Sequence, residues 1–117
     1  MSDIKYELAH VGINGANSEE AHAIASLFAE IFGLPVKEGN RSVFAGSAVE
    51  VMRTPFKGRL GHIGFATPDC EAAMKDLESR GYEMDMSTAK YKPDGTLNAV
   101  YLKQEVGGFA VHIVKKP

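Results

Sequence analysis

Residues 61–67 read GHIGFAT and lead directly into a helix-start signal, Thr67-Pro68-Asp69. A related stretch, AHVGIN, occupies residues 9–14 and precedes a second helix-start signal, Asn17-Ser18. In both stretches a histidine is followed by an apolar residue, a glycine and another apolar residue. Alternation of this kind is typical of a β-strand whose two faces have different surroundings. The recurrence therefore predicts one unit, a histidine-bearing strand followed by a helix, that is used twice.

The first half of the chain can be divided into elements from its patterning. Alternation predicts a strand over residues 7–14, and Gly33 with Pro35 ends the helix that follows it. Residues 36–53 are interrupted by two turn-forming clusters and predict two or three short strands. The helix is expected to bury the apolar residues that recur at helical spacing, namely Ala21, Ile24, Leu27, Phe28 and Ile31.

The second half repeats this order. Thr67 is the expected N-cap of a helix that has Pro68 at its first position and stops at Gly81. Strands are expected near residues 82–91 and 97–104, with a last strand over Phe109 to Val114. The chain thus predicts an α+β fold of one domain, residues 1–117. Its two strand–helix–strand–strand–strand modules would span residues 5–54 and 59–115, each to within a few residues.

Four residues with metal-binding side chains occupy matching places in the two modules. Aligning residues 48–52 with residues 110–114 makes Glu50 equivalent to His112, and His10 is equivalent to His62. Imidazole nitrogens and a carboxylate held on rigid strands can bind a divalent first-row metal and leave a position open for water or substrate. The long spacing within each module matches no short metal-binding motif, so the repeat itself carries the prediction.

Two other interpretations of these residues stay open at this point. The four side chains could form an internal hydrogen-bonded network that holds no ligand, because buried polar groups normally find partners. The same strands could also hold a small molecule without performing chemistry. The fourth histidine, His22, lies on the polar side of the first helix and is left out of the site.

Composition limits the classes of partner. The formal net charge is −2, which argues against a nucleic-acid-binding surface, and no apolar run approaches the length needed to cross a membrane. A single cysteine excludes an internal disulfide framework. We therefore expect a cytoplasmic protein that binds a small molecule, with neither nucleic acid nor membrane as a partner.

The pattern resembles a known superfamily. The duplicated strand–helix–three-strand unit, with LAHVGI at residues 8–13 and GHIGFA at residues 61–66, is similar to the vicinal oxygen chelate superfamily. That superfamily includes glyoxalase I, methylmalonyl-CoA epimerase, bleomycin-resistance proteins and extradiol dioxygenases. KYELAHVGIN at residues 5–14 and EVGGF at residues 105–109 also look like the glyoxalase-like domain that is appended to some bacterial 2-keto-3-deoxy-6-phosphogluconate/4-hydroxy-2-oxoglutarate aldolases.

The resemblance implies a cup-shaped mixed sheet built by pairing of two βαβββ modules. It implies that the metal ligands are His10, Glu50, His62 and His112, with zinc, nickel, cobalt or iron as the metal. Metal-dependent relatives usually carry glutamate at the position of His112, so Glu50 is the one candidate for both ligand and catalytic base. The implied activity is that of a lyase or isomerase of the glyoxalase I type acting on a small α-keto or α-hydroxy acid.

The resemblance also bears on partners. A homodimer is expected, and the site could lie within one chain or across two. A functional link to a keto-deoxy-phosphogluconate aldolase is a further expectation. The alternative function is a non-catalytic module that senses or sequesters a sugar acid.

Overall fold

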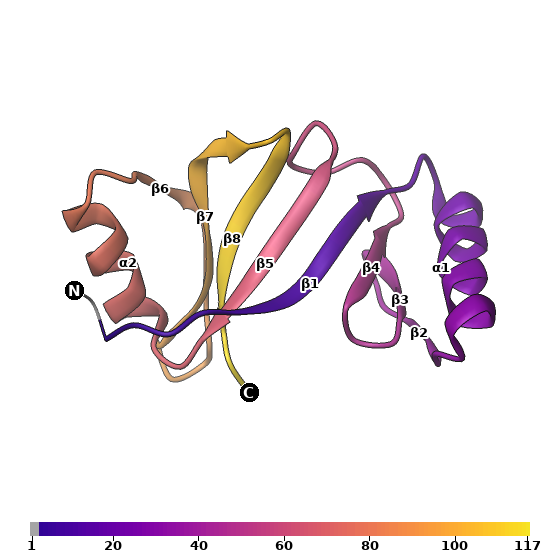
Figure 1. Cartoon of the computed structure of the whole chain (residues 1–117), viewed down its shortest axis with the longest axis horizontal. Coiled ribbons are helices and arrows are strands. Elements are labelled where there is room, and N and C mark those ends of the chain that lie inside the picture. Colours follow the sequence, from indigo (N-terminus) through magenta and orange to yellow (C-terminus); the bar gives the residue numbers. More distant parts are fainter. Residues whose placement is uncertain (1–2) are drawn as a thin grey trace.

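The computed structural model describes residues 3–117 as a curved sheet with one helix packed near each end (Figure 1). The first module consists of β1 (Glu7–Asn14), α1 (Ser18–Phe32), β2 (Val36–Glu38), β3 (Ser42–Ala45) and β4 (Val49–Met52). The second module consists of β5 (Gly61–Thr67), α2 (Cys70–Ser79), β6 (Met84–Tyr91), β7 (Leu97–Val106) and β8 (Phe109–Lys115). This confirms the predicted α+β class and the repeated element order. No helix among the described residues is long and apolar enough to span a membrane.

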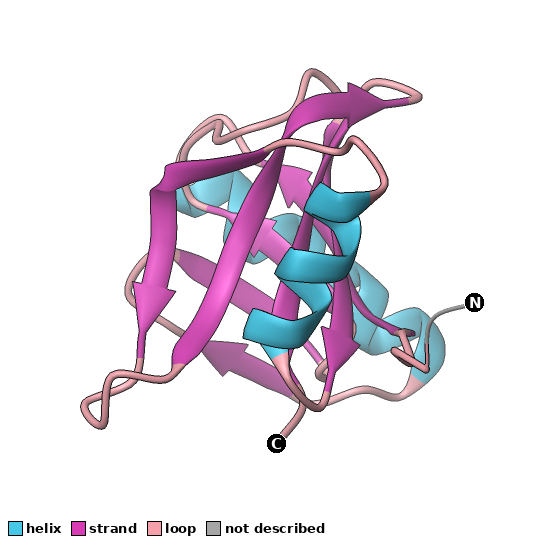
Figure 2. Cartoon of the chain, turned by 90° about the vertical axis from the view of Figure 1, so that its left-hand side faces the viewer, coloured by secondary structure: helices cyan, strands magenta, loops and turns pink. Residues whose placement is uncertain are grey.

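The two modules join through their first strands. The sheet order is β2-β3-β4-β1-β5-β8-β7-β6, so β1 and β5 lie at its centre. They pair antiparallel, whereas β1 pairs parallel with β4 and β5 pairs parallel with β8. Each first strand is therefore flanked by the last strand of its own module and by the first strand of the other. The sheet forms a cup with the helices on its outer face (Figure 2).

Two small apolar cores lie between the sheet and the helices. One packs Ala21 and Ala25 of α1 against Val43 and Val51 of the first module. The other packs Cys70 and Ala73 of α2 against Met84, Leu97, Val100 and Ile113. Because neighbouring strand residues point to opposite faces, Val51 and Ile113 face the cores while Glu50 and His112 face the inside of the cup. The inside of the cup is thus available for polar side chains.

The α1 packing corrects the predicted buried stripe. Ala21, Ala25 and Ala29 are buried, whereas Leu27 and Ile31 are 58% and 61% exposed. Alanines at successive i, i+4 positions form one line along a helix and let its backbone approach the sheet closely. Ile24 packs against this core as predicted, whereas Leu27 and Ile31 are left outside the contact with the short strands β3 and β4. Helical spacing identified the apolar residues but placed the contact line wrongly.

The two helix starts differ in how well they were predicted. The sequence left Asn17 and Ser18 as competing caps of α1, and the structure has Asn17, which accepts a hydrogen bond from the backbone N–H of Glu20 at 2.8 Å. Thr67 is not the cap of α2, because it is the last residue of β5 and the helix begins at Cys70. The cap is Asp69, whose side chain accepts from the backbone N–H of Ala72 at 3.1 Å.

Candidate metal centre

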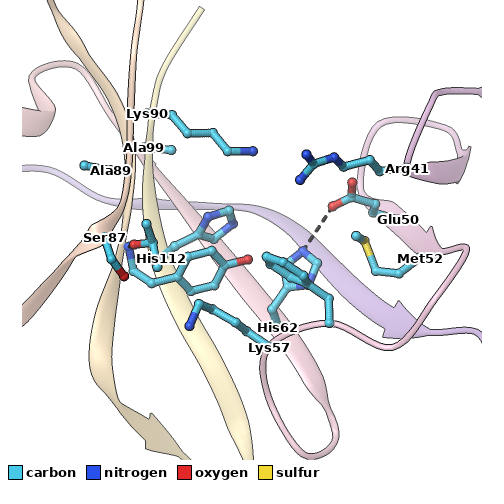
Figure 3. A pocket seen from close by; sticks show the side chains of 13 residues that line it. Arg41, Glu50, Met52, Lys57, His62, Ser87, Ala89, Lys90, Ala99 and His112 are labelled. Carbon is cyan, nitrogen blue, oxygen red and sulfur yellow. Dashed lines mark hydrogen bonds and ion pairs between the residues drawn. The ribbon is translucent and has the colours of Figure 1, made fainter.

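The four predicted residues lie on four neighbouring strands. Glu50 is on β4, His10 on β1, His62 on β5 and His112 on β8, which are adjacent in the sheet. All four side chains point to the inside of the cup, and Figure 3 shows Glu50, His62 and His112 directed toward its centre. The structure therefore brings the four residues together within a single chain.

The potential ligand atoms lie close to one another. Glu50 Oε1 is 3.0 Å from His62 Nε2 and 3.7 Å from His10 Nε2. His10 Nε2 is in turn 3.0 Å from His112 Nε2. One ring nitrogen from each of the three histidines lies within 4.8 Å of those of the other two. Ligands about 2.1 Å from a tetrahedral metal lie about 3.4 Å apart, so three neighbouring imidazoles with this spacing can hold an ion.

The glycines of the repeated motif make room for the histidines. In the antiparallel β1–β5 pair, His10 lies opposite Gly64 and Gly12 lies opposite His62. A Cβ atom at Gly12 would lie 1.9 Å from the His62 ring, and one at Gly64 would lie 2.5 Å from His10 and 2.8 Å from His112. Each imidazole thus occupies the space above the glycine of the other module. This reciprocal packing gives the His-x-Gly pattern a structural reason.

Glu50 is held as an ionised carboxylate. Burial raises the pKa of this carboxyl, but hydrogen bonds from His62 and Ser42 more than offset burial and leave the pKa below its usual value. Ser42 Oγ donates to Glu50 Oε2 at 2.7 Å, so Oε1 is the oxygen directed toward the histidines. A carboxylate with one oxygen fixed by a hydroxyl and the other facing imidazoles has the arrangement of a metal ligand with an outer-shell support.

His112 is held as a neutral imidazole. Its side chain is buried, and its ring stacks on Tyr101 with centroids 4.3 Å apart at an interplanar angle of 17°. Burial, with added repulsion from His10 and His62, lowers the pKa of His112 to about 3. Burial also lowers the pKa of His10. Neutral imidazoles present the lone pair that a metal requires.

His62 is the most deeply placed of the four and is 2% exposed. Its Nδ1 is buried without a hydrogen-bond partner, while its Nε2 faces Glu50. An internal hydrogen-bonded network would pair His62 Nε2 with Glu50 and His10 Nε2 with His112 Nε2, and it would leave His62 Nδ1 unpaired, as metal binding through Nε2 also would. The neutral donors, the ionised carboxylate and their spacing fit a divalent transition metal.

A cavity of about 450 Å³ opens beside the cluster. Besides Glu50, His62 and His112, its lining comprises Arg41, Met52, Phe56, Lys57, Ser87, Thr88, Ala89, Lys90, Ala99 and Tyr101. The size is within the range of small-molecule sites. Burial, with the charge of Glu50 adding to it, raises the pKa of the Tyr101 phenol to about 12, so that this group stays protonated.

Several lining residues were missed or placed differently by the sequence. Arg41 and Lys57 belong to no motif, and the sequence favours solvated side chains for them, with orientation of an anionic substrate as the alternative; it gives no indication of Lys90 or Tyr101. Tyr101 lies directly opposite His112 in the β7–β8 register, so strand alternation would have indicated it once the pairing was known. His22 is exposed on α1 and does not join the cluster, as predicted.

No family model and no curated protein sequence matches the chain. Solved structures do match it. A hypothetical protein from Bacillus halodurans has a TM-score of 0.68 at 15% identity, over 97% of this chain and 96% of that one.

Two methylmalonyl-CoA epimerases are also similar. The Streptomyces coelicolor enzyme, in complex with 2-nitronate-propionyl-CoA, has a TM-score of 0.66 at 17% identity, over 93% of this chain and 96% of that one. The Mycobacterium tuberculosis enzyme has a TM-score of 0.63 at 18% identity, over 94% and 87%. At such identities the likeness is one of fold. The chain therefore has the glyoxalase-like fold of two βαβββ modules, which it shares with proteins of the vicinal oxygen chelate superfamily.

Proposed function

We propose that this chain is a metal-dependent enzyme of the glyoxalase I type, a lyase or isomerase that acts on a small α-keto or α-hydroxy acid or a related compound. The observation that carries the proposal is the convergence of Glu50 Oε1 and the three histidine Nε2 atoms beside a cavity of substrate size. The ligands would be His10, Glu50, His62 and His112.

The metal would be zinc, nickel, cobalt or iron, because three imidazoles and one carboxylate suit these ions better than magnesium. When bound, such an ion supplies a Lewis acid that polarises two neighbouring substrate oxygens. The neutral imidazoles of His10 and His112 need no deprotonation before they bind it. The site would therefore be ready for metal at neutral pH.

Glu50 is the candidate for proton transfer. Its carboxylate is ionised at neutral pH and can accept a proton from the carbon next to a polarised carbonyl and return it. Ser42 holds Oε2 and limits the carboxylate to one orientation. The protonated Tyr101 phenol lines the same cavity and can donate a hydrogen bond to a substrate oxygen.

A second candidate function is a binding module that senses or sequesters a sugar acid. It is favoured by His112, which stands where metal-dependent relatives usually carry glutamate. A neutral imidazole with a pKa of about 3 is a poor base, so the second module offers no counterpart to Glu50 for moving a proton. Turnover of any substrate would decide against this candidate.

The broader assignments rest on the resemblance. We propose that residues 1–117 form one domain and that this domain belongs to the vicinal oxygen chelate superfamily. A functional link to a keto-deoxy-phosphogluconate aldolase is also proposed. Including the substrates of that aldolase in the screen would test the link. We also propose a cytoplasmic location, which the single cysteine supports. A homodimer is supported by the exposed Leu27, Ile31 and Phe32 of α1, and light scattering would measure it.

Elemental analysis of untagged protein purified without chelator tests the metal site. We expect about one transition-metal ion per chain and its loss in His62→Ala. His22→Ala is the matched control, because His22 is an exposed histidine outside the cluster and its removal should leave metal content unchanged. A panel of α-keto acids, α-hydroxy acids and hemithioacetals would then be screened for turnover, with Glu50→Gln as the inactive variant.

The outcomes separate the candidates. Metal in the wild type and turnover that Glu50→Gln abolishes support the enzyme. Metal without turnover, together with tight binding of a panel member, supports the binding module. No metal, even after zinc, nickel, cobalt or iron is added, contradicts the proposed site and leaves the hydrogen-bonded network as the explanation of the four side chains.

A further inference from the structure

The cavity is lined mainly by positively charged side chains, although the formal net charge of the whole protein is negative. Arg41, Lys57 and Lys90 line it together with one carboxylate, Glu50, so the lining carries a net charge of +2 before the histidines are counted. The whole chain has a formal net charge of −2. A cavity of one sign concentrates ions of the opposite sign, and a bound divalent metal would strengthen this field further.

Two of the three cations have no carboxylate partner among the described residues. Lys57 Nζ lies 3.7 Å from Asp85 Oδ2. Within residues 3–117, no ion pair and no side-chain hydrogen bond engages the Arg41 guanidinium or the Lys90 ammonium. Their charges are therefore available to a ligand in the cavity.

The two free cations approach the cavity from opposite modules. Arg41 directly precedes β3, and the next residue, Ser42, donates to Glu50. Lys90 lies on β6 opposite Ala99 of β7, and Ala99 also lines the cavity. In Figure 3 the charged ends of Arg41 and Lys90 are directed toward each other on one side of the cavity. An anion between them would contact both modules.

We propose that Arg41 and Lys90 bind a second anionic group of the substrate, a carboxylate or a phosphate, while its α-keto or α-hydroxy acid end lies at the histidine cluster. This deepens and rests on the proposed function. A guanidinium presents paired donors that match the oxygens of either group, and an ammonium adds a point charge. The cavity of about 450 Å³ has room for a substrate with acidic groups at both ends.

Matched ligands test the second anionic group. 2-Oxoglutarate and 2-oxopentanoate share the keto-acid end and the chain length, and differ in having a carboxylate or a methyl group at the far end. 3-Phosphoglycerate and glycerate form the corresponding pair for phosphate. Calorimetry on the zinc-loaded protein should show that at least one dianion binds about tenfold or more tightly than its partner, since hydrogen bonds between charged groups are the strong ones. The pair that shows the difference identifies carboxylate or phosphate.

Charge-removing variants locate the effect. Arg41→Gln and Lys90→Gln should each weaken binding of the preferred dianion about tenfold and change the monoacid less than about twofold. Arg59→Gln and Lys92→Gln are the matched controls, because both side chains are exposed and lie outside the cavity lining. Zinc content should stay the same in all four variants.

The test distinguishes this inference from the proposed function. If zinc binds but neither dianion is preferred over its monoacid, the second anion site is wrong and the metal site stands. If zinc does not bind, the proposed function fails, and inorganic phosphate is titrated into the metal-free protein instead. Phosphate binding that Arg41→Gln and Lys90→Gln both weaken would then support the cation pair, and binding that is absent or unchanged in the variants would overturn it.

Discussion

The two modules place one candidate ligand each, Glu50 and His112, at equivalent positions of their last strands and surround these residues differently. Glu50 of β4 lies opposite Phe44 of β3 and receives a hydrogen bond from Ser42. His112 of β8 lies opposite Tyr101 of β7 and is stacked on its ring. One module thus supplies an ionised, hydrogen-bonded carboxylate, and the other supplies a buried, neutral imidazole.

The two modules share their strand pairing and differ in the side chains that surround Glu50 and His112. Duplication fixes the position of a ligand, because strand pairing and side-chain alternation are the same in both modules. The strand beside it, β3 or β7, gives each position different neighbours, while burial and the other side chains of the cluster are the main influences on both pKa values. The residue two positions before the aromatic neighbour is Ser42 in the first module and Ala99 in the second. The Ser42 hydroxyl therefore accompanies the charged Glu50, and the Ala99 methyl group occupies the equivalent place near the uncharged His112.

Acid should destabilise the metal-free protein chiefly through His112 of the second module, and His10 of the first module, whose pKa is also lowered, acts in the same direction. The pKa of His112 is about 3 when folded and about 6.5 when unfolded. Between these values the unfolded state binds a proton that the folded state does not, so stability is full above pH 6.5 and falls as the pH is lowered. The slope from this residue is up to about 1.4 kcal/mol per pH unit, or roughly 2–3 kcal/mol between pH 6.5 and 4.5.

Urea unfolding at several pH values measures this slope. His112→Gln should flatten it, whereas His22→Gln, which replaces an exposed histidine, should leave it unchanged. Glu50 contributes in a lower window, because its depressed pKa means that its share of stability is lost only when the pH falls below the ordinary carboxyl range. Equal slopes in the wild type and His112→Gln would contradict the neutral, buried state of His112.

The reciprocal glycines give the next largest effect. Gly12→Ala would place a methyl group where the His62 ring lies, and we expect a loss of about 2 kcal/mol in unfolding free energy from overpacking. Removing the ring should remove the clash. In a His62→Ala background the same substitution should therefore cost less than about 0.5 kcal/mol. An additive double-mutant cycle would show that Gly12 is needed for some other reason.

The repeat made the centre of the sheet predictable. His-x-Gly in both modules indicated two equivalent strands, and the alignment of the last strands identified Glu50 and His112. These are local patterns, and the face of a strand follows from alternation alone. What the pattern did not contain was the antiparallel pairing of β1 with β5, which brings the four side chains together within one chain.

The rest of the site depends on contacts between distant segments. Arg41 and Lys90 lie 49 positions apart in the sequence and line the same cavity because the sheet curves. Tyr101 lies beside His112 because the two residues are opposite each other in the β7–β8 register, which the sequence does not give. The α1 stripe was right for Ala21 and Ile24 and wrong for Leu27 and Ile31, since periodicity identifies an apolar face but not the line along which a short sheet touches it. Such features follow from curvature and register, which local patterns do not encode.

The hydroxyl of Ser42 offers the smallest and sharpest test of the difference between the modules. Ser42→Ala removes the hydrogen bond to Glu50 Oε2, and we expect a loss of about 1 kcal/mol in unfolding free energy and a tenfold or smaller drop in metal affinity. Ala99→Ser adds a hydroxyl at the equivalent place, where the ligand is uncharged, and should change both quantities little. If Ala99→Ser raised metal affinity as much as Ser42→Ala lowers it, the neighbouring hydroxyl would act on either ligand alike. The contrast would then lie in the ligands themselves, and the strand beside them would not set it.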